Sequence, residues 1–423
     1  FFYGFSGGWR LSEEEFMKNV KFVNELKLRL SYGVVGNQSG ISRYDGMQLY
    51  NFNSVNGAYI GDGRISYIKT SGEIATMGRS WERIHNYNLG LDFHLFDSRL
   101  QGTVELFMKK NNNMLIAVAY PGILGDKAPA SNSGKFEAKG YEGTVTWSDK
   151  IGKVNYHVGG TFTYADNKLV DYGGVTVFKS GFVDKQQGYS LNSVFGLKYC
   201  GKIQTEEQLR KYIYKYYNSN GIGMPKDLRL GDNMYEDVNG DGKLDEKDYV
   251  YLGSDDPKIS YSFNVGIEWN NFDLSAVFQG AAKRTIFRDE SNDNYRIPMR
   301  AAHLNSTTQS VGNVWSPDNR DGRYPTYTNI STINNYNYQC SSWSVENGNY
   351  LRLKSLTLGY NFPASLLSKT KAISRLRIYV SGADLWEVSK INDGWDPEAS
   401  RKVSGNGRFP FNRTCTVGLD VTF

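Results

Sequence analysis

Two adjacent segments alternate strictly between apolar and polar residues, and this alternation is the strongest constraint on the fold. In residues 259–269 every second side chain is apolar, and 272–278 repeats the pattern after Asn270 and Asn271. Because successive side chains of a strand point to opposite faces, each segment is predicted to be a strand with one apolar and one polar face. The two asparagines suit a tight reversal. The sequence therefore predicts a β-hairpin.

The same alternation recurs along the whole chain. Outside the hairpin, the segments that show it or could continue it are 1–10, 26–34, 87–95, 100–108, 141–147, 154–164, 351–361, 376–380 and 415–423. Together they make about eleven predicted strands. In 351–361 the apolar phase changes partway, which we interpret as a strand whose first part projects beyond the apolar surroundings.

The connections between these strands alternate in length. The short ones are 11–25, 96–98, 149–151, 270–271 and 362–374. The long ones are 36–83, 110–136, 166–257, 281–349 and 386–412. All long connections should therefore leave one end of an antiparallel sheet, as in a transmembrane β-barrel with short periplasmic turns and long extracellular loops. An odd number of strands does not fit a closed bacterial barrel, so we expect the chain not to close alone.

Two short segments carry local predictions. Ser12 and Glu15 form a capping-box pattern, which predicts a short helix to about Val20. The segment 205–217 predicts a second helix within a long connection. The chain begins with Phe1 and no signal sequence, so we expect further residues to precede it.

Composition is consistent with a barrel and limits the alternatives. No run of about 18 apolar residues predicts a membrane helix, but a barrel strand needs only about 9 to 11 residues per crossing. The 14% aromatic content fits either aromatic girdles at two membrane interfaces or an aromatic-rich soluble β-core. The net charge of +5 is scattered, so no nucleic-acid partner is expected. Three distant cysteines support neither a disulfide framework nor a CxxC metal site.

An acidic segment before the hairpin has the spacing of a Ca²⁺ loop. The predicted ligands, at loop positions 1, 3, 5, 7, 9 and 12, are Asp237, Asn239, Asp241, Lys243 through its backbone carbonyl, Asp245 and Asp248. Gly242 at position 6 allows the sharp turn of such a loop. Position 12 is Asp rather than Glu, and no flanking helix pair is evident. A structural Ca²⁺ ion and a metal-free acidic turn are the alternatives.

No motif predicts catalysis. Residues 4–8 fit GxSxG formally, but a nucleophile elbow needs a strand that leads into a helix. The four histidines, His85, His94, His157 and His303, lack a metal-ligand spacing. His94 and His157 fall on the polar faces of their strands, as expected of a water-filled lumen. The chain is predicted not to be an enzyme.

Six segments resemble one known family. They are 26–38, 87–115, 237–280, 347–363, 376–386 and 416–423. In order along the chain they are similar to the C-terminal half of SusC-like TonB-dependent outer-membrane transporters of Bacteroidota, the SusC/RagA family. The acidic loop followed by YLGSDDPKISYSFNVGIEW is the most specific of these matches.

The resemblance implies an all-β, antiparallel transmembrane barrel of 22 strands, of which this chain supplies about half. Residues 1–423 would form the C-terminal portion of the barrel, and the N-terminal plug domain would lie outside them. The implied partners are a SusD-like surface lipoprotein that acts as a lid, TonB acting through the plug, and outer-membrane lipid. The family often pairs into dimers of transporter and lid. The implied location is the outer membrane, crossed many times, with extracellular loops.

The predicted function is active import of a nutrient oligosaccharide, and an oligopeptide is the alternative cargo. A soluble Ca²⁺-binding protein that binds or cleaves carbohydrate is the second alternative. Aromatic residues in the long loops are candidate substrate contacts, since they could stack on sugars or pack against peptide side chains. They are Trp315, Tyr324, Tyr327, Tyr336, Tyr338, Trp343 and Trp395. The competing interpretation is that these rings pack the loops together or onto the lid.

Overall fold

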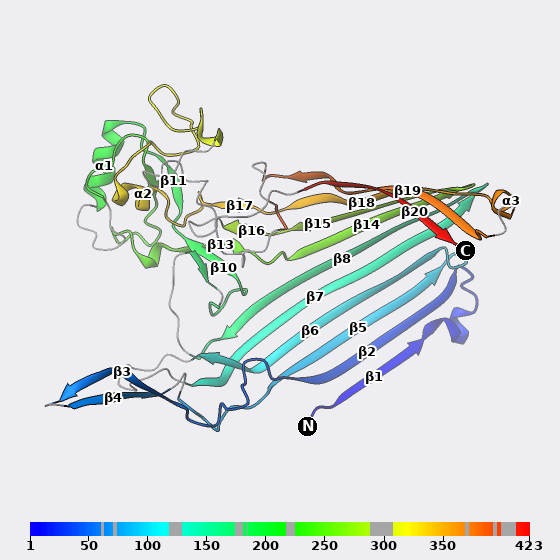
Figure 1. Cartoon of the computed structure of the whole chain (residues 1–423), viewed down its shortest axis with the longest axis horizontal. Helices are drawn as coiled ribbons and strands as arrows, with labels where there is room; N and C mark the ends of the chain where they lie inside the picture. The colour runs from blue at the N-terminus through cyan, green and yellow to red at the C-terminus, as the bar shows by residue number, and fades with distance from the viewer. Residues whose placement is uncertain are drawn as a thin grey trace.

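One antiparallel sheet of eleven strands dominates the computed structural model (Figure 1). The structure describes residues 1–60, 63–70, 74–117, 129–173, 181–183, 185–216, 225–287, 308–368, 372–391, 396–398 and 412–423. The sheet strands are β1 (Gly4–Arg10), β2 (Val23–Asn37), β5 (Glu82–Leu95), β6 (Leu100–Ala117), β7 (Ala130–Ile151), β8 (Val154–Asp171), β14 (Ile259–Trp269), β15 (Phe272–Ala282), β18 (Tyr350–Asn361), β19 (Arg375–Ser389) and β20 (Thr414–Thr422). The predicted fold class and number of sheet strands are confirmed.

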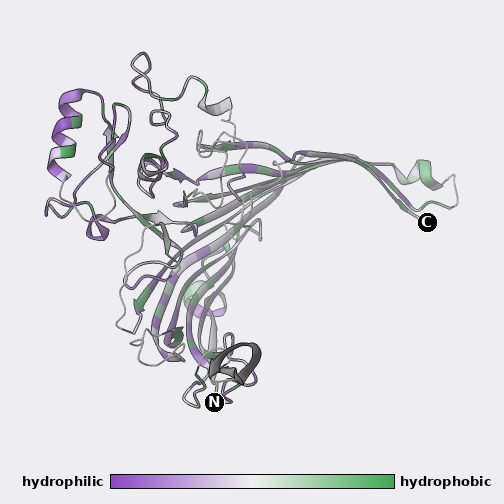
Figure 2. Cartoon of the chain, turned by 60° about the vertical axis from the view of Figure 1, so that its left-hand side comes forward, coloured by the Kyte–Doolittle hydropathy of each residue, from purple (hydrophilic) through white to green (hydrophobic). Residues whose placement is uncertain are grey.

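The sheet is an up-and-down meander that does not close on itself. Each strand pairs with the next sheet strand along the chain, and β1 and β20 are its two edges. Figure 2 shows how strongly the strands curve between the two ends of the sheet. The predicted hairpin is confirmed, since Trp269 pairs with Phe272 and Asn270 adopts a left-handed φ of 51°.

The short connections lie at one end of the sheet, beside α3 (Ala364–Leu367) (Figure 1). The predicted capping-box helix is wrong. In its place are two 3₁₀ turns, η1 (Leu11–Glu13) and η2 (Glu15–Met17), without a side-chain cap. Glu14 between them has an extended backbone, which interrupts the helix, because the chain must return within a few residues to pair β2 with β1.

Register places apolar side chains side by side on one face. One row of directly opposed residues across six strands is Leu30, Leu89, Leu106, Tyr141, Tyr164 and Ile259. Leu30 is 63% and Leu106 is 52% exposed. A sheet that leaves large apolar side chains in the open on one face needs an apolar environment to cover them.

A double bulge explains the phase change in β18. Leu353 pairs with Trp386 and Ser355 with Ala383, so Lys354 has no directly paired residue, and Asp384 opposite adopts a φ of 56°. The extra residue restores the alternation, and the leucines before and after it share one face. Our interpretation that the strand projects beyond its apolar surroundings is therefore not needed.

The long connections fold at the other end of the sheet. The elements there are β3 (Tyr50–Ile60), β4 (Gly63–Thr70), β9 (Gly181–Val183), β10 (Ser193–Gly196), β11 (Tyr199–Lys202), α1 (Glu206–Tyr216), β12 (Asn233–Tyr235), η4 (Glu246–Asp248), β13 (Val250–Ser254), β16 (Thr285–Phe287), η5 (Thr308–Ser310), α2 (Ser331–Asn337) and β17 (Val345–Asn347). The predicted helix near 205–217 is confirmed as α1. Hairpin β3–β4 lies in the long connection 36–83, where no strand was predicted. None of the described helices is long and apolar enough to cross a membrane.

Residues 185–216, 225–254 and 308–347 form a compact unit, which we call the loop module. Its core is a cluster of buried apolar and aromatic residues: Leu197, Ile203, Tyr212, Tyr216, Leu228, Tyr235, Leu244 and Tyr336. Figure 1 shows α1, α2 and β11 together at this end of the sheet. The long loops therefore carry their own hydrophobic core.

Candidate functional site

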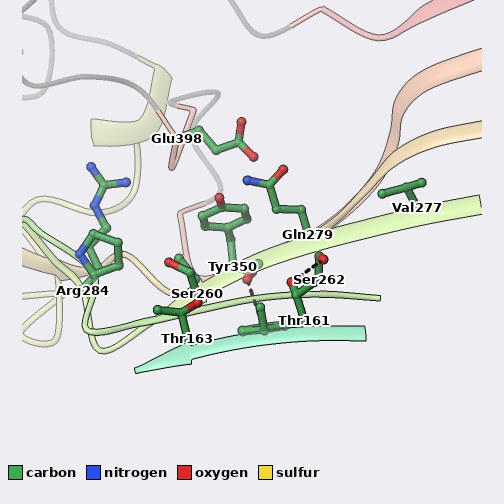
Figure 3. A pocket seen from close by; sticks show the side chains of 13 residues that line it. Thr161, Thr163, Ser260, Ser262, Val277, Gln279, Arg284, Tyr350 and Glu398 are labelled. Carbon is green, nitrogen blue, oxygen red and sulfur yellow. Dashed lines mark hydrogen bonds between the residues drawn. The ribbon is translucent and has the colours of Figure 1, made fainter. Parts of the chain in front are cut away.

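A pocket of about 680 Å³ lies where the polar face of the sheet meets the long connections. Its residues come from strands β8, β14, β15 and β18 and from three loop segments, which contribute Pro257, Arg284 and Glu398. The side chains that Figure 3 labels are Thr161, Thr163, Ser260, Ser262, Val277, Gln279, Arg284, Tyr350 and Glu398. Glu398 lies across the pocket from Thr161 and Thr163 (Figure 3).

The sheet side of the pocket is neutral and rich in hydroxyl groups. Thr161 Oγ1 and Ser262 Oγ are 2.7 Å apart and share a hydrogen bond. Both belong to a row of directly opposed residues on the polar face: Lys27, Asp92, Thr103, Thr144, Thr161, Ser262, Gln279, Arg352 and Glu387. The five central members are uncharged, and charged residues stand on both sides of them. We call these five residues the hydroxyl stripe.

Charged side chains beside the stripe neutralise one another. On one side, Arg29 Nε lies 2.7 Å from Asp92 Oδ2, and Arg29 Nη2 lies 2.5 Å from Glu105 Oε1. Arg29 is thus engaged by two carboxylates from neighbouring strands. The charge of Arg29 at this border of the stripe is therefore balanced by carboxylates.

On the other side, Arg352 is the centre of an ion-pair cluster. It donates to Glu387 on β19, and its Nη2 lies 2.7 Å from Asp396 Oδ1. Arg352 Nη1 lies 3.2 Å from Glu398 Oε2. The guanidinium also lies 5.6 Å from the centre of the Tyr350 ring. Arg352 is the largest fully buried side chain of the described residues, although it belongs to the polar face.

Two further cations, Lys354 and Arg284, bind the segment 396–398 that contains Asp396 and Glu398. Lys354 Nζ, on the bulge, lies 2.8 Å from Glu398 Oε2 and 3.2 Å from Asp384 Oδ1. Arg284 Nε donates to the backbone oxygen of Asp255 at 2.8 Å, and Arg284 Nη1 donates to the backbone oxygen of Pro397. The three residues 396–398 are therefore fixed to the sheet end by three different cations.

The predicted Ca²⁺ loop is closed by its own hydrogen bonds. Asp237 accepts backbone N–H groups from Gly240 at 2.7 Å and Gly242 at 2.9 Å. Asp248 accepts N–H groups from Val238 at 2.9 Å and Asp245 at 2.8 Å. Both glycines have positive φ angles, which the turn requires.

The remaining predicted ligands lie around these two carboxylates without converging on a metal position. Asn239 Oδ1 and Asp241 Oδ1 accept backbone N–H groups two residues further on. Asp245 caps η4, and the Lys243 side chain is exposed. In the part of the chain that the structure describes, no three His, Cys, Asp or Glu side chains are grouped so that they could hold a metal ion. Ca²⁺ at this loop stays a prediction.

The carboxylate of Asp237 is held in its charged form. Its side chain is only 1% exposed, and Lys215 Nζ lies 3.6 Å away. Burial alone would raise the pKa of Asp237, but the N–H groups of Gly242 and Gly240 stabilise the charge, and the pKa lies below the usual 3.8. The loop is thus closed by an ionised carboxylate at neutral pH.

Six of the candidate aromatic residues lie within the loop module, and five of them are buried or half-buried there. Trp315, Tyr324 and Tyr336 are at most 5% exposed, and Trp343 and Tyr338 are half-buried with ring centres 5.5 Å apart. Buried rings of this kind hold loop segments together and offer little surface to a ligand.

The other two candidate residues are Tyr327 and Trp395. Tyr327 is 43% exposed, and its hydroxyl bonds Ser310 Oγ at 3.2 Å. Trp395 lies outside the described residues. None of the six candidates that the structure describes lines the pocket described above, and contact of the seven with substrate stays a prediction.

Sequence reasoning missed Glu398, which lines the pocket, and two cations that pair with it, Arg352 and Lys354. Arg352, Lys354 and Glu398 follow no motif, and only the bulge reveals where Lys354 points. The neutral residues of the stripe were placed on polar faces by alternation, but their alignment depends on register. One sequence feature could have indicated the stripe: four strands that are consecutive in the sheet each carry a Thr or Ser at a polar position. These residues are Thr103, Thr144, Thr161 and Ser262.

The structure defines a class before any relative is considered. An antiparallel meander with one exposed apolar face and one polar face is the wall of a membrane β-barrel. No protein-family model matches the chain. Similarity to individual proteins is extensive, however.

Two sequence relatives and one solved structure show what this wall is similar to. The TonB-dependent receptor P3 of Formosa agariphila is 28% identical over 98% of this chain and 41% of its own length. The TonB-dependent receptor SusC of Bacteroides thetaiotaomicron is 24% identical over 98% of this chain and 39% of its own. The solved structure of the RagAB peptide transporter matches with a TM-score of 0.77 and 23% identity, over 100% of this chain and 43% of that one.

The resemblance to SusC-like TonB-dependent receptors is therefore confirmed. Along nearly its whole length the chain is a relative of TonB-dependent receptors, SusC among them. It spans about two fifths of the length of the relatives that it matches.

Proposed function

We propose that this chain forms the C-terminal part of the barrel wall, with the extracellular loops, of a TonB-dependent importer in the outer membrane. The apolar face would contact lipid, and the polar face would line the passage. The loop module lies at the long-connection end and would face the cell exterior. Residues outside this chain would supply the rest of the barrel and the plug through which TonB acts.

The cargo that the site supports best is a nutrient oligosaccharide. The observation that carries this proposal is the hydroxyl stripe, since Thr, Ser and Gln side chains exchange hydrogen bonds with sugar hydroxyls without adding charge. Arg29 on one side and Arg352 on the other are each paired with carboxylates, so neither guanidinium requires a charged ligand. A neutral polyhydroxyl solute matches this surface.

An oligopeptide is the second candidate cargo. It is favoured by the structural likeness to a protein named a peptide transporter. Peptides carry charged termini, which would need unpaired charges along the wall. Arg29 and Arg352 already have carboxylate partners, so the described wall favours the oligosaccharide.

The proposed partners are those that the family resemblance implies. We include in the proposal a SusD-like lipoprotein lid over the loop module and assembly of transporter–lid pairs into dimers. A soluble Ca²⁺-binding carbohydrate protein, the remaining alternative, would leave the apolar face of the sheet without a covering. Receptors and transporters of this kind are not enzymes, and we assign no catalytic residue.

Uptake by the complete transporter in its native outer membrane tests the proposal. Labelled neutral oligosaccharides should enter in a TonB-dependent manner, and labelled peptides should not. Ser262→Asp places an unpaired carboxylate in the stripe and should lower uptake about tenfold. The carboxylate must lose its hydration when the sugar binds, and it cannot donate the hydrogen bond that the serine hydroxyl can donate.

The matched control is Gln101→Glu, which adds the same charge to a polar face near a short turn, away from the pocket. It should leave uptake within about twofold of the parent, since an exposed charge far from the site is screened. Uptake of peptides alone would overturn the oligosaccharide proposal. Oligosaccharide uptake that is equally fast with and without TonB would overturn the proposal of a TonB-dependent importer.

A further inference from the structure

Arg352 is buried on a face where its neighbours are open. Gln279, directly opposite it on β15, is exposed, and Ser262 beyond Gln279 is partly exposed. Arg352 by contrast has no exposed surface. A charged side chain on the polar wall of a water-filled passage should be hydrated, so something must cover it.

The cover is the segment Asp396–Glu398, from the connection between β19 and β20. Asp396 and Glu398 pair with Arg352, and the backbone oxygen of Pro397 accepts from Arg284. The segment is also ordered internally, because Glu398 N donates to Asp396 Oδ1 at 2.9 Å. All three residues are therefore held in place. Because the proline ring fixes φ at Pro397, ordering the segment costs less conformational entropy.

The strands are shaped to receive this segment. Lys354 is the residue without a direct partner in the double bulge, and Asp384 opposite it takes a left-handed conformation. The bulge sends Lys354 toward Glu398, 2.8 Å away, instead of leaving it in the regular alternation. A bulge that re-aims one side chain is a common device beside a functional site.

The charges divide into two sets. Each cation has a carboxylate on the sheet or beside it that does not belong to the segment: Arg352 with Glu387, Lys354 with Asp384, and Arg284 with Asp255. Asp396 and Glu398 are additional partners. If the segment leaves, no cation on the wall loses its last carboxylate, and the two freed carboxylates enter water. Release therefore avoids the large penalty of an unpaired buried charge.

We propose that residues 396–398 form a reversible strap over the pocket. When closed, the strap covers Arg352 and Tyr350, and Glu398 forms one side of the pocket. When open, it deepens the pocket along the hydroxyl stripe and widens the passage. Its role in import rests on the proposed function, but its opening is measurable without transport.

Thiol modification in the complete transporter tests the strap. Cys200→Ser and Cys415→Ser remove the exposed thiols of this chain and leave the buried Cys340, and the parent with both changes gives the background rate. Tyr350→Cys then places a thiol under the strap, where Tyr350 is 7% exposed. Gln279→Cys places a matched thiol in the same pocket but outside the strap's cover.

Asp396→Asn with Glu398→Gln should open the strap. It removes the charge-assisted bonds that hold the segment, so the Tyr350→Cys thiol should react with a neutral methanethiosulfonate reagent about tenfold faster. The rate at which the Gln279→Cys thiol reacts should change by less than about twofold, since that thiol is exposed whether the strap is closed or open. Equal rates at Tyr350→Cys with and without the strap charges would overturn the proposal.

Glu387→Gln is the control for general damage to the cluster. It removes one partner of Arg352 on the wall and leaves both strap carboxylates in place. The strap should stay closed and the Tyr350→Cys rate should stay within about twofold of the parent, because Arg352 keeps two carboxylate partners. A tenfold rise in this variant would mean that any loss of charge opens the wall, and it would overturn the strap.

Uptake separates this inference from the importer proposal. If thiol reactivity responds as expected while oligosaccharide uptake is absent in every variant, the import proposal fails and the strap stands. If uptake is normal and TonB-dependent but the thiol does not respond, the strap fails and the importer stands.

Discussion

The hydroxyl groups of Tyr212 and Tyr336 lie 2.7 Å apart in the interior of the loop module. Tyr212 is on α1 and Tyr336 is on α2, so this contact joins two long connections that are far apart in sequence. The Tyr212 hydroxyl also accepts the backbone N–H of Tyr235 at 2.8 Å. The two helices and β12 therefore share one buried hydrogen-bond network.

Tyr212→Phe should loosen the module. It leaves the buried N–H of Tyr235 without its acceptor, which should lower the free energy of local unfolding by about 1–3 kcal/mol. Hydrogen exchange of the amides in α1 and β12 measures this change. Tyr214→Phe on the same helix is the control, because Tyr214 is 88% exposed and should have no effect. Equal protection in the two variants would contradict the assigned network.

The acidic loop should open only in strong acid. The pKa of Asp237 is lowered below 3.8 by the N–H groups that it accepts, so its contribution to stability is complete above that pH. As pH falls through the lowered pKa, the carboxylate gains a proton and this contribution is lost. Protection of the Gly240 and Gly242 amides should be constant above pH 4 and fall below about pH 3.8.

Asp237→Asn provides the comparison for that pH profile. The amide cannot ionise, so protection of the two glycine amides should be lower at neutral pH and independent of pH through the acid range. A profile that still falls below pH 3.8 in this variant would assign the transition to another carboxylate.

Calcium removal tests the predicted metal loop. If Ca²⁺ binds, a chelator should lower the thermal midpoint of the purified transporter, and added Ca²⁺ should restore it. Asp241→Asn should abolish this response, since Asp241 is exposed and its loss leaves the bonds of Asp237 and Asp248 intact. Magnesium is the control ion. An unchanged midpoint in chelator would establish the metal-free acidic turn.

Gly140→Ala should disturb the middle of the sheet. A Cβ atom at Gly140 would lie 2.0 Å from the backbone oxygen of Tyr164, so β7 and β8 would have to separate. We expect a loss of about 1–3 kcal/mol in stability. The temperature at which the folded barrel unfolds in detergent measures this loss. Gly7→Ala, with no atom within 4 Å, should have no effect.

The sequence by itself determined the strands of the eleven-stranded sheet, their faces and the ends from which the loops leave. These properties follow from a period of two within each strand and from the lengths between strands, which are local quantities. They were enough to predict an eleven-stranded wall. In β18 the apolar alternation shifts by one residue, but the bulge compensates for the shift. Leu351 and Leu358 therefore lie on the same face of the sheet.

Only the tertiary structure decided which side chains meet. Capping residues predicted a helix after Ser12, but the need to return to β1 replaced it with two 3₁₀ turns. Glu398 reaches Arg352 because strand register and the path of a long connection bring them together, and neither is written in a local pattern. The same holds for Tyr212 and Tyr336. Alternation fixes the face on which a residue lies, while its partners depend on how distant segments fold against one another.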